Sequence, residues 1–148
     1  MSNIAVAREI LDRVRRAGVT DFCVCGGSRN APLLAVVSGP VYTFIDERSA
    51  AFFALGRAKR DGRPVAVITT SGTAAAELLP AAVEAYYSGV PLLLITADRP
   101  ARYRGTGAPQ AIEQIGLFGR YAETDLDRWS RRGPLHVNVE FDEPLIDE

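Results

Sequence analysis

The stretch PVAVITTSGT, residues 64–73, carries the clearest fold information in the chain. Its first seven residues form a short apolar run rich in β-branched side chains, which is typical of a buried strand. Ser71-Gly72-Thr73 then predicts a turn into an alanine-rich helix that extends to about Tyr87, with a kink near Pro80. A nearly continuous apolar strand followed by a helix is typical of a parallel sheet that is covered on both faces.

The same unit recurs on both sides of this stretch. The predicted strands are residues 21–25, 41–45, 64–70, 91–97 and 135–141, and the other predicted helices are residues 3–17, 30–37 and 46–60. Four of the five strands are nearly continuously apolar rather than alternating. We therefore predict an α/β fold, an open doubly wound parallel sheet with helices on both faces and right-handed crossovers.

Length and composition narrow the class of protein. The 148 residues fit a single domain, and a net charge of −1 offers no basic surface for nucleic acid. The apolar run at 90–97 is too short to span a membrane, and charges near the N-terminus argue against a signal peptide, so we expect a cytoplasmic protein. Cys23 and Cys25, spaced C-x-C, are expected to be buried and reduced rather than a redox or zinc pair.

Polar segments follow four of the predicted strands. These segments are residues 26–30, 46–48, 71–73 and 97–100. Because the carboxyl ends of parallel strands meet at one edge of a sheet, we expect all four along one rim. The first segment places Ser28, Arg29 and backbone N–H groups at a helix N-terminus, which suits a carboxylate or phosphate but equally suits a solvated turn. Neither a G-x-G-x-x-G fingerprint nor a P-loop occurs.

The other segments also have two interpretations each. Asp46 and Glu47 fit helix capping, but Glu47 also fits a partly buried carboxylate of raised pKa that shares a proton with a ligand. Gly72 fits a simple turn or the close approach of a ligand to the backbone. Arg99 is an anion clamp or a surface arginine. His136, the only histidine, lies in a strand pattern and is expected to be structural, and no metal-binding spacing is found.

Six motifs in order carry a family resemblance. They are Gly27-Ser28-Arg29, Asp46-Glu47-Arg48-Ser49-Ala50, PVAVITTSGT at 64–73, TADRP at 96–100, RGTGA at 104–108 and Gln110-Ala111-Ile112. Together they resemble the N-terminal domain of thiamine-diphosphate (ThDP)-dependent 2-succinyl-5-enolpyruvyl-6-hydroxy-3-cyclohexene-1-carboxylate synthases, the MenD family of menaquinone biosynthesis. The resemblance extends over residues 24–118 and returns, more weakly, at 133–145.

The resemblance implies a role for each candidate residue. Glu47 would be catalytic, because it matches the glutamate that hydrogen-bonds the aminopyrimidine ring of ThDP and exchanges a proton with it. Cofactor binding would also involve Ser71, Gly72 and Thr73. Contacts to the carboxylates of isochorismate and 2-oxoglutarate would come from Ser28, Arg29, Arg99 and Gln110. The implied reaction is decarboxylation of 2-oxoglutarate and addition of the resulting carbanion equivalent to isochorismate.

The chain departs from the family pattern in three places. The G-D-G…N motif that holds Mg²⁺ and the cofactor diphosphate is absent, so we expect Mg²⁺ to be bound by a diphosphate-binding domain or subunit outside this sequence, and the chain alone to be inactive. Pro109 stands where the family usually has asparagine. The stretches between Phe118 and Gly133 and between Val37 and Val41 are short, and a helix before the last strand is expected to be missing.

The quaternary structure and two other functions follow from similar reasoning. In the family the cofactor lies between domains of different subunits, so the resemblance implies a homo-oligomer, with the helix at 73–87 as a candidate contact. One alternative function is the α-subunit of a split ThDP decarboxylase of the sulfopyruvate or phosphonopyruvate type. The other is a binding domain that keeps the fold without catalysis. The TADRP and RGTGA segments favour the synthase.

Overall fold

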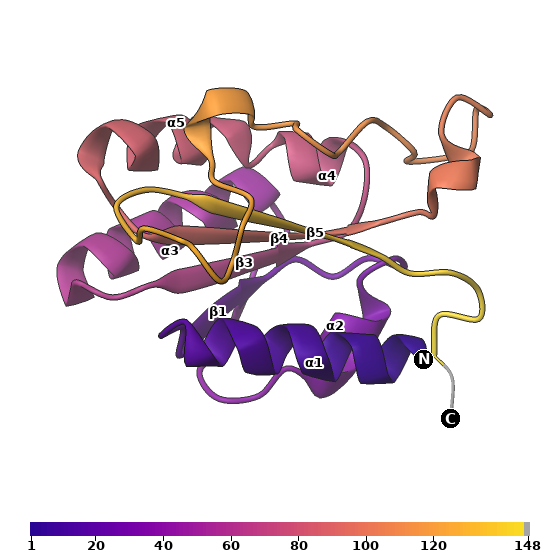
Figure 1. The fold of residues 1–148 in the computed structure, drawn as a ribbon, viewed down its shortest axis with the longest axis horizontal. Helices are drawn as coiled ribbons and strands as arrows, with labels where there is room; N and C mark the ends of the chain where they lie inside the picture. Colours follow the sequence, from indigo (N-terminus) through magenta and orange to yellow (C-terminus); the bar gives the residue numbers. More distant parts are fainter. Residues whose placement is uncertain (147–148) are drawn as a thin grey trace.

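The computed structural model describes residues 1–146 as a five-stranded parallel sheet between two layers of helices (Figure 1). The strands are β1 (Asp21–Val24), β2 (Val41–Thr43), β3 (Val65–Thr69), β4 (Leu92–Asp98) and β5 (Leu135–Glu140). The helices are α1 (Asn3–Arg16), α2 (Ala31–Val36), α3 (Glu47–Asp61), α4 (Thr73–Ala76) and α5 (Leu79–Ser88), with 3₁₀ turns η1 (Ala101–Tyr103) and η2 (Gly119–Tyr121). The predicted α/β class and the parallel sheet are confirmed.

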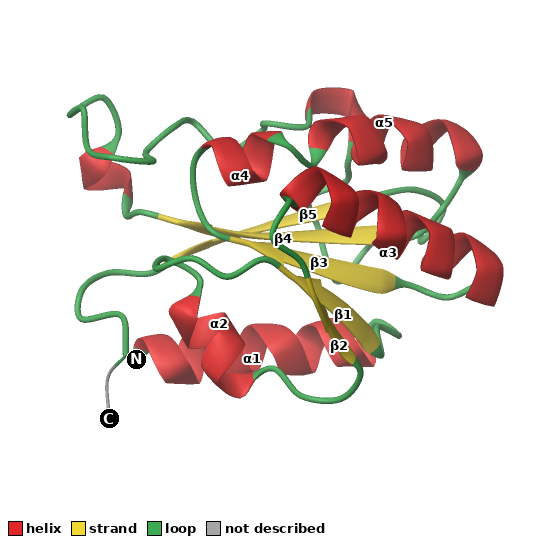
Figure 2. Ribbon diagram, turned by 180° about the vertical axis from the view of Figure 1, so that it is seen from behind, coloured by secondary structure: helices red, strands yellow, loops and turns green. Residues whose placement is uncertain are grey.

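The sheet separates two hydrophobic cores. Seen from either side, α1 and α2 cover one face while α3, α4 and α5 cover the other (Figure 2). Alternate residues of one strand enter opposite cores: Ile68 packs with the α1 layer and Val67 with the α3 layer. Every residue of β1, β3 and β4 is buried, which explains the continuous apolar runs, whereas the edge strand β2 is exposed at two of its three residues.

The predicted helix at 73–87 is two helices, so this prediction is corrected. The helix α4 ends at Ala76 and α5 begins at Leu79, with Pro80 in its first turn. Proline has no N–H, and its ring clashes with the carbonyl four residues earlier, which here belongs to Ala76. The chain therefore breaks between Ala76 and Leu79 instead of bending within one continuous helix.

Strand order determines where the loops meet. The order is β2-β1-β3-β4-β5, so the chain moves outward from β1 to β2 and then returns to the other side of β1 to form β3. At such a reversal the loops that leave the two central strands diverge, and ligands of open α/β sheets bind in the crevice between them. Residues 26–30 after β1 and residues 70–73 after β3 flank this point.

The region before β5 contains little regular structure. Between Phe118 and Leu135 the structure contains the turn η2 but no α-helix, and Glu123 makes a single parallel bridge to Leu135. The two ends of the described chain lie side by side (Figures 1 and 2), and the Asn3 side-chain amide donates to the carbonyl oxygens of Asp142 and Pro144. None of the helices within residues 1–146 has the length and hydropathy needed to cross a membrane.

Candidate functional site

The loops after β1, β3 and β4 touch one another at the carboxyl ends of the strands. A Cβ atom added at Gly27 would lie 2.6 Å from the Thr70 side chain, so the loop after β1 packs tightly against the residue that follows β3. A Cβ added at Gly72, which has φ +79°, would lie 3.0 Å from the Cα of Gln110. Glycine is therefore required at both contacts, and the predicted rim is a continuous surface.

The turn after β1 is organised by Asn30. Its side-chain amide donates to the Cys25 carbonyl at 2.8 Å, while its Oδ1 accepts from the Gly27 N–H at 2.9 Å. Ser28 remains exposed. Arg29 is 4% exposed, and its guanidinium donates to the Phe141 carbonyl at 2.8 Å and to the Glu143 carboxylate at 3.1 Å. Arg29 thus ties the loop between β1 and α2 to the segment after β5, and its predicted substrate contact stays a prediction.

Glu47 begins α3 and is half-buried. The preceding residue, Asp46, caps the helix by accepting from the N–H and the hydroxyl of Ser49 at 2.7 and 2.6 Å, and these bonds lower the Asp46 pKa. The capping expected of Asp46 is therefore confirmed. Within residues 1–146, no hydrogen bond or ion pair occupies the Glu47 carboxylate. It is free to accept a hydrogen bond from a ligand that lies at the N-terminus of α3.

Cys25 shows how close Glu47 lies to the end of β1. Burial, together with the nearby charges of Glu47 and Asp46, raises the pKa of Cys25 to about 12. Burial likewise raises the pKa of Cys23 to about 12. Both thiols are free and buried, as expected, and both lie on the α3 side of the sheet. Neither is a nucleophile near neutral pH, because only the thiolate reacts.

The Ser71-Gly72 turn is held by a glutamine that the sequence did not single out. The Gly72 N–H donates to Oε1 of Gln114 at 2.8 Å. Gln114 is completely buried, and its Nε2 donates to the Ala97 carbonyl at 3.1 Å and to Oδ1 of Asn138 at 2.9 Å. Ser71 is 2% exposed, whereas Thr73 is exposed. The Gln114 side chain therefore links the turn after β3 and the end of β4 to β5.

Asn138 links Gln114 to a buried polar network. Its Nδ2 donates to Asp98 at 2.8 Å, and its Oδ1 also accepts from the Thr96 hydroxyl at 2.7 Å. Since that hydroxyl proton points at Asn138, the Nε2 of His136, 2.7 Å from Thr96, must carry the proton that it shares with the hydroxyl. Burial lowers the pKa of His136 to about 4, so the ring is neutral, and the structural role expected of His136 is confirmed.

The long loop after β4 is attached along its length. Arg104 donates to Asp98 at 3.1 Å and to Glu140 at 2.6 Å. Arg99 donates through Nε to the Pro109 carbonyl at 2.9 Å and is half-exposed, with its guanidinium 5.6 Å from the centre of the Tyr103 ring. The side chain of Gln110 is exposed beside Gly72, and Gln110 has φ +54°. The structure thus brings Arg99 and Gln110 together over the Gly72 turn.

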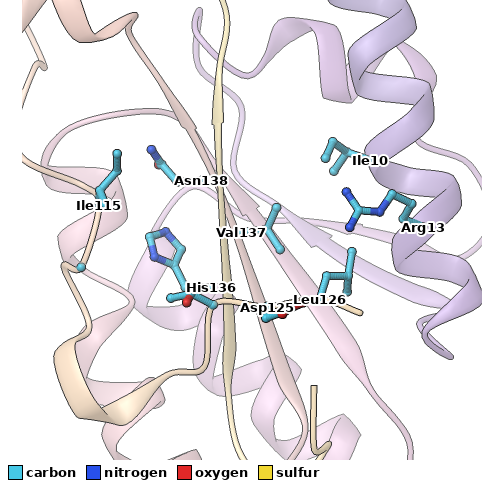
Figure 3. A pocket seen from close by; sticks show the side chains of 10 residues that line it. Ile10, Arg13, Ile115, Asp125, Leu126, His136, Val137 and Asn138 are labelled. Atoms are coloured by element: carbon cyan, nitrogen blue, oxygen red, sulfur yellow. The ribbon is translucent and has the colours of Figure 1, made fainter. Parts of the chain in front are cut away.

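Two hollows lie on different parts of the molecule. One, of about 400 Å³, adjoins the start of α3 and is lined by Asp46, Arg48, Ser49, Phe52 and Glu77. The other, of about 440 Å³, straddles the open edge of β5 (Figure 3). In that groove His136 and Asn138 point toward Ile115 on one side, whereas Val137 faces Ile10 and Leu126 on the other. Only the first hollow adjoins the predicted rim.

Comparison with known proteins identifies the family. Residues 4–117 match the family described as "Thiamine pyrophosphate enzyme, N-terminal TPP binding domain". The chain belongs to this family. Thiamine pyrophosphate is another name for ThDP, so the resemblance of the rim motifs and the cofactor class are both confirmed.

Three relatives from bacteria are each named 2-succinyl-5-enolpyruvyl-6-hydroxy-3-cyclohexene-1-carboxylate synthase. The protein of Bdellovibrio bacteriovorus is 50% identical over 162 aligned positions, which cover 99% of this chain and 31% of the relative. That of Akkermansia muciniphila is 51% identical, covering 97% and 30%, and that of Geobacillus kaustophilus is 47% identical, covering 95% and 29%. The chain thus spans about 30% of the length of these relatives.

The alignment with the Bdellovibrio protein has 162 positions, whereas 99% of 148 residues is about 147, so about 15 positions of that protein have no counterpart here. The expectation that residues 118–133 and 37–41 are shortened stays a prediction.

The residues present fit the pyrimidine portion of ThDP. Glu47 offers an uncommitted carboxylate at the N-terminus of α3, and the Gly72 turn lies directly against the backbone of Gln110. The hydroxyl of Thr69, at the end of β3, is buried and has no hydrogen-bond partner among the described residues. No group of three or more His, Cys, Asp or Glu side chains within residues 1–146 could hold a metal ion.

Sequence reasoning missed three polar residues of this thiamine pyrophosphate domain: Asn30, Gln114 and Asn138. Asn30 carried a signal, because an asparagine within a glycine-containing turn commonly orders the turn through its own side chain. Gln114 and Asn138 carried none. Their partners lie 17 to 42 residues away along the chain, and no local pattern marks such pairs.

Proposed function

We propose that this chain is the pyrimidine-binding part of a ThDP-dependent synthase of the 2-succinyl-5-enolpyruvyl-6-hydroxy-3-cyclohexene-1-carboxylate type. The observation that carries the proposal is the uncommitted Glu47 carboxylate at the rim of a chain about 50% identical to such synthases. The names of these relatives favour the synthase over the split decarboxylase. The uncommitted Glu47 carboxylate favours a catalytic domain over a fold that only binds.

The substrates we propose are 2-oxoglutarate and isochorismate. The bond between C1 and C2 of 2-oxoglutarate breaks with release of CO₂, and bound ThDP would supply the electron sink for the electron pair that is left on C2. This pair then forms a new bond to one carbon of a C=C double bond of isochorismate, and the other carbon of that double bond takes up a proton. Both substrates carry carboxylates, and Arg99 with Ser28 and Gln110 offers hydrogen-bond donors on exposed or half-exposed positions of the rim.

Glu47 would hold and exchange a proton with the ring of the cofactor. A carboxyl group at a helix N-terminus is held near the positive end of the helix dipole, and its half-buried position limits competition from water. Ser71, Gly72 and Thr73 would pack against the same ring from the β3 side. The rest of the domain would hold Glu47 and residues 71–73 at the separation that the cofactor ring requires.

Completion of the site requires further protein. We propose that a diphosphate-binding domain or subunit holds Mg²⁺ and the diphosphate group of the cofactor, and that the working protein is a cytoplasmic homo-oligomer. The relatives are about three times as long as this chain, which gives room for such a domain. Exposed aromatic side chains on α3 and α5 (Phe52, Phe53, Tyr86 and Tyr87) supply apolar surface for the contact.

The test replaces Glu47 by glutamine in protein that includes a diphosphate-binding domain. We expect Glu47→Gln to lower kcat by about 10²-fold or more, because an amide cannot exchange the proton. The control is Glu9→Gln, an exposed carboxylate on α1 at the opposite face of the sheet, which should leave kcat unchanged. Equal turnover of the wild type and the Glu47→Gln protein, with 2-oxoglutarate and isochorismate as substrates, would refute the assignment.

A further inference from the structure

The loop after β4 lies directly on the turn after β3. A Cβ atom at Gly72 would stand 3.0 Å from the Cα and 3.2 Å from the carbonyl oxygen of Gln110, so two backbones meet here without a side chain between them. At its start the loop is held by Arg99, which donates to the Pro109 carbonyl at 2.9 Å. Such close backbone contact needs a separate interaction to fix its spacing, because glycine contributes no packing of its own.

Gln114 supplies that interaction. Its completely buried amide accepts from the Gly72 N–H at 2.8 Å and donates to the Ala97 carbonyl and the Asn138 Oδ1 at 3.1 and 2.9 Å. The three partners belong to the β3 turn, β4 and β5, whereas Gln114 itself belongs to the loop. Asn138 is in turn held by Asp98 and Thr96, so the position of Gln114 is set by the rigid part of the sheet.

We propose that Gln114 is a positioning residue that sets the separation between the Ser71-Gly72 turn and the loop carrying Arg99 and Gln110. The inference rests on the proposed function to the extent that the turn faces the cofactor and the loop faces the substrate. Gln114 touches neither ligand and acts through the Gly72 amide and the loop backbone. Its loss removes the side-chain partner of the Gly72 N–H and of the Ala97 carbonyl and leaves Asn138 Oδ1 with the Thr96 hydroxyl alone, so the turn and the loop separate to reach water.

The experiment compares two variants of similar expected stability. Gln114→Leu removes all three hydrogen bonds with little change in side-chain volume. Thr96→Val breaks the contacts of Thr96 to His136 and Asn138 in the same network but leaves the bond between Gln114 and Gly72 in place. The first measurement is amide hydrogen exchange of Gly72 by NMR in this chain, referred to the amides of the central strands β3 and β4. The nuclear Overhauser effect between Gly72 and Gln110 is recorded with it.

The two variants should differ in Gly72 amide exchange and in affinity for ThDP. In Gln114→Leu we expect Gly72 exchange to accelerate about tenfold or more beyond any change in the strand amides, and the Gly72–Gln110 Overhauser effect to weaken. In Thr96→Val both signals should stay within about twofold of the wild type after the same correction. The second measurement is the dissociation constant of ThDP with Mg²⁺ and a diphosphate-binding domain present, which should rise about tenfold in Gln114→Leu and change less than twofold in Thr96→Val.

The outcomes distinguish this inference from the proposed function. Unchanged Gly72 exchange in Gln114→Leu, or equal acceleration in both variants, would overturn the positioning role. If Gln114→Leu does not fold, Gln114→Asn replaces it, since the shorter side chain cannot span from Asn138 to Gly72 and the same exchange result is expected. Failure of the wild type to bind ThDP would count against the proposed function, while the Gly72 exchange in this chain would still decide the role of Gln114.

Discussion

The two sides of the rim are held in different ways. On the β4–β5 side, Gln114, Asn138, Thr96 and Asp98 form a buried network in which each side chain bonds to at least one other. On the β1–β2 side, the helix α3 is capped by Asp46, and the adjoining Glu47 carboxylate has no such partner among the described residues. The comparison sets a hydrogen-bonded frame against an uncommitted carboxylate, which is the arrangement expected if Glu47 binds a ligand as we propose.

The largest effect is expected at the charged centre of the network. Asp98 is 1% exposed and accepts from Arg104, from Asn138 and from the backbone N–H of Arg99. Asp98→Ala leaves all three donors short of a partner, so we expect the free energy of unfolding to fall by about 3–5 kcal/mol. Urea unfolding followed by circular dichroism measures the loss. A loss below about 1 kcal/mol would show that the network adds little to stability, and the contrast between the two sides would disappear.

A somewhat smaller change in the free energy of unfolding is expected when the pH is lowered. The pKa of His136 is lowered by burial to about 4, below the value of about 6.5 expected in the unfolded chain. As pH falls, the unfolded chain therefore binds the proton first, and stability that is fully present above pH 6.5 is lost progressively down to about pH 4. The shift corresponds to about 3 kcal/mol at most.

The His136→Gln variant isolates this contribution from that of the carboxylates. Glutamine can donate to the Thr96 hydroxyl as the ring Nε2–H does, but it does not titrate. The free energy of unfolding, measured from pH 7 to pH 4, should fall less steeply in the variant than in the wild type. Parallel curves for the two proteins would mean that His136 is protonated in the folded state.

The smallest effect on stability is expected on substitution of Glu47. Glu47 makes no hydrogen bond or ion pair within the described residues, so Glu47→Gln should change the free energy of unfolding by no more than about 0.5 kcal/mol. The same urea titration as for Asp98→Ala measures it. If the free energy of unfolding fell by about 2 kcal/mol or more, Glu47 would have a structural role in the domain, and its proposed role in proton exchange would be weakened.

The sequence was informative where structure depends on local pattern. The order of strands and helices, the Asp46 cap and the gathering of four polar segments at one rim followed from periodicity and turn residues. The single helix at 73–87 was wrong, because the effect of Pro80 on the carbonyl of Ala76 was judged too mild.

The frame of the site could not be predicted from pattern. Gln114 lies between an exposed glutamate and an exposed isoleucine, and nothing nearby indicates that its amide is buried. Its partners come from two strands and a turn whose proximity exists only in the folded sheet. Likewise, the pairing of Arg29 with Phe141 and Glu143 depends on a separation of more than 110 residues, so an arginine that the motif suggested for substrate turned out to have partners within the protein.

The contact of Asn3 with the backbone of Asp142 and Pro144 has a practical consequence for engineering. Because the two ends of the described chain meet, a short linker can join them, and new ends can be opened at an exposed turn such as Gly62, which follows α3. A circularly permuted chain of this kind keeps every strand and both cores intact. A second domain could then be fused at the new ends instead of the old ones. Its position relative to Glu47 and the Gly72 turn could be varied in this way without altering the rim.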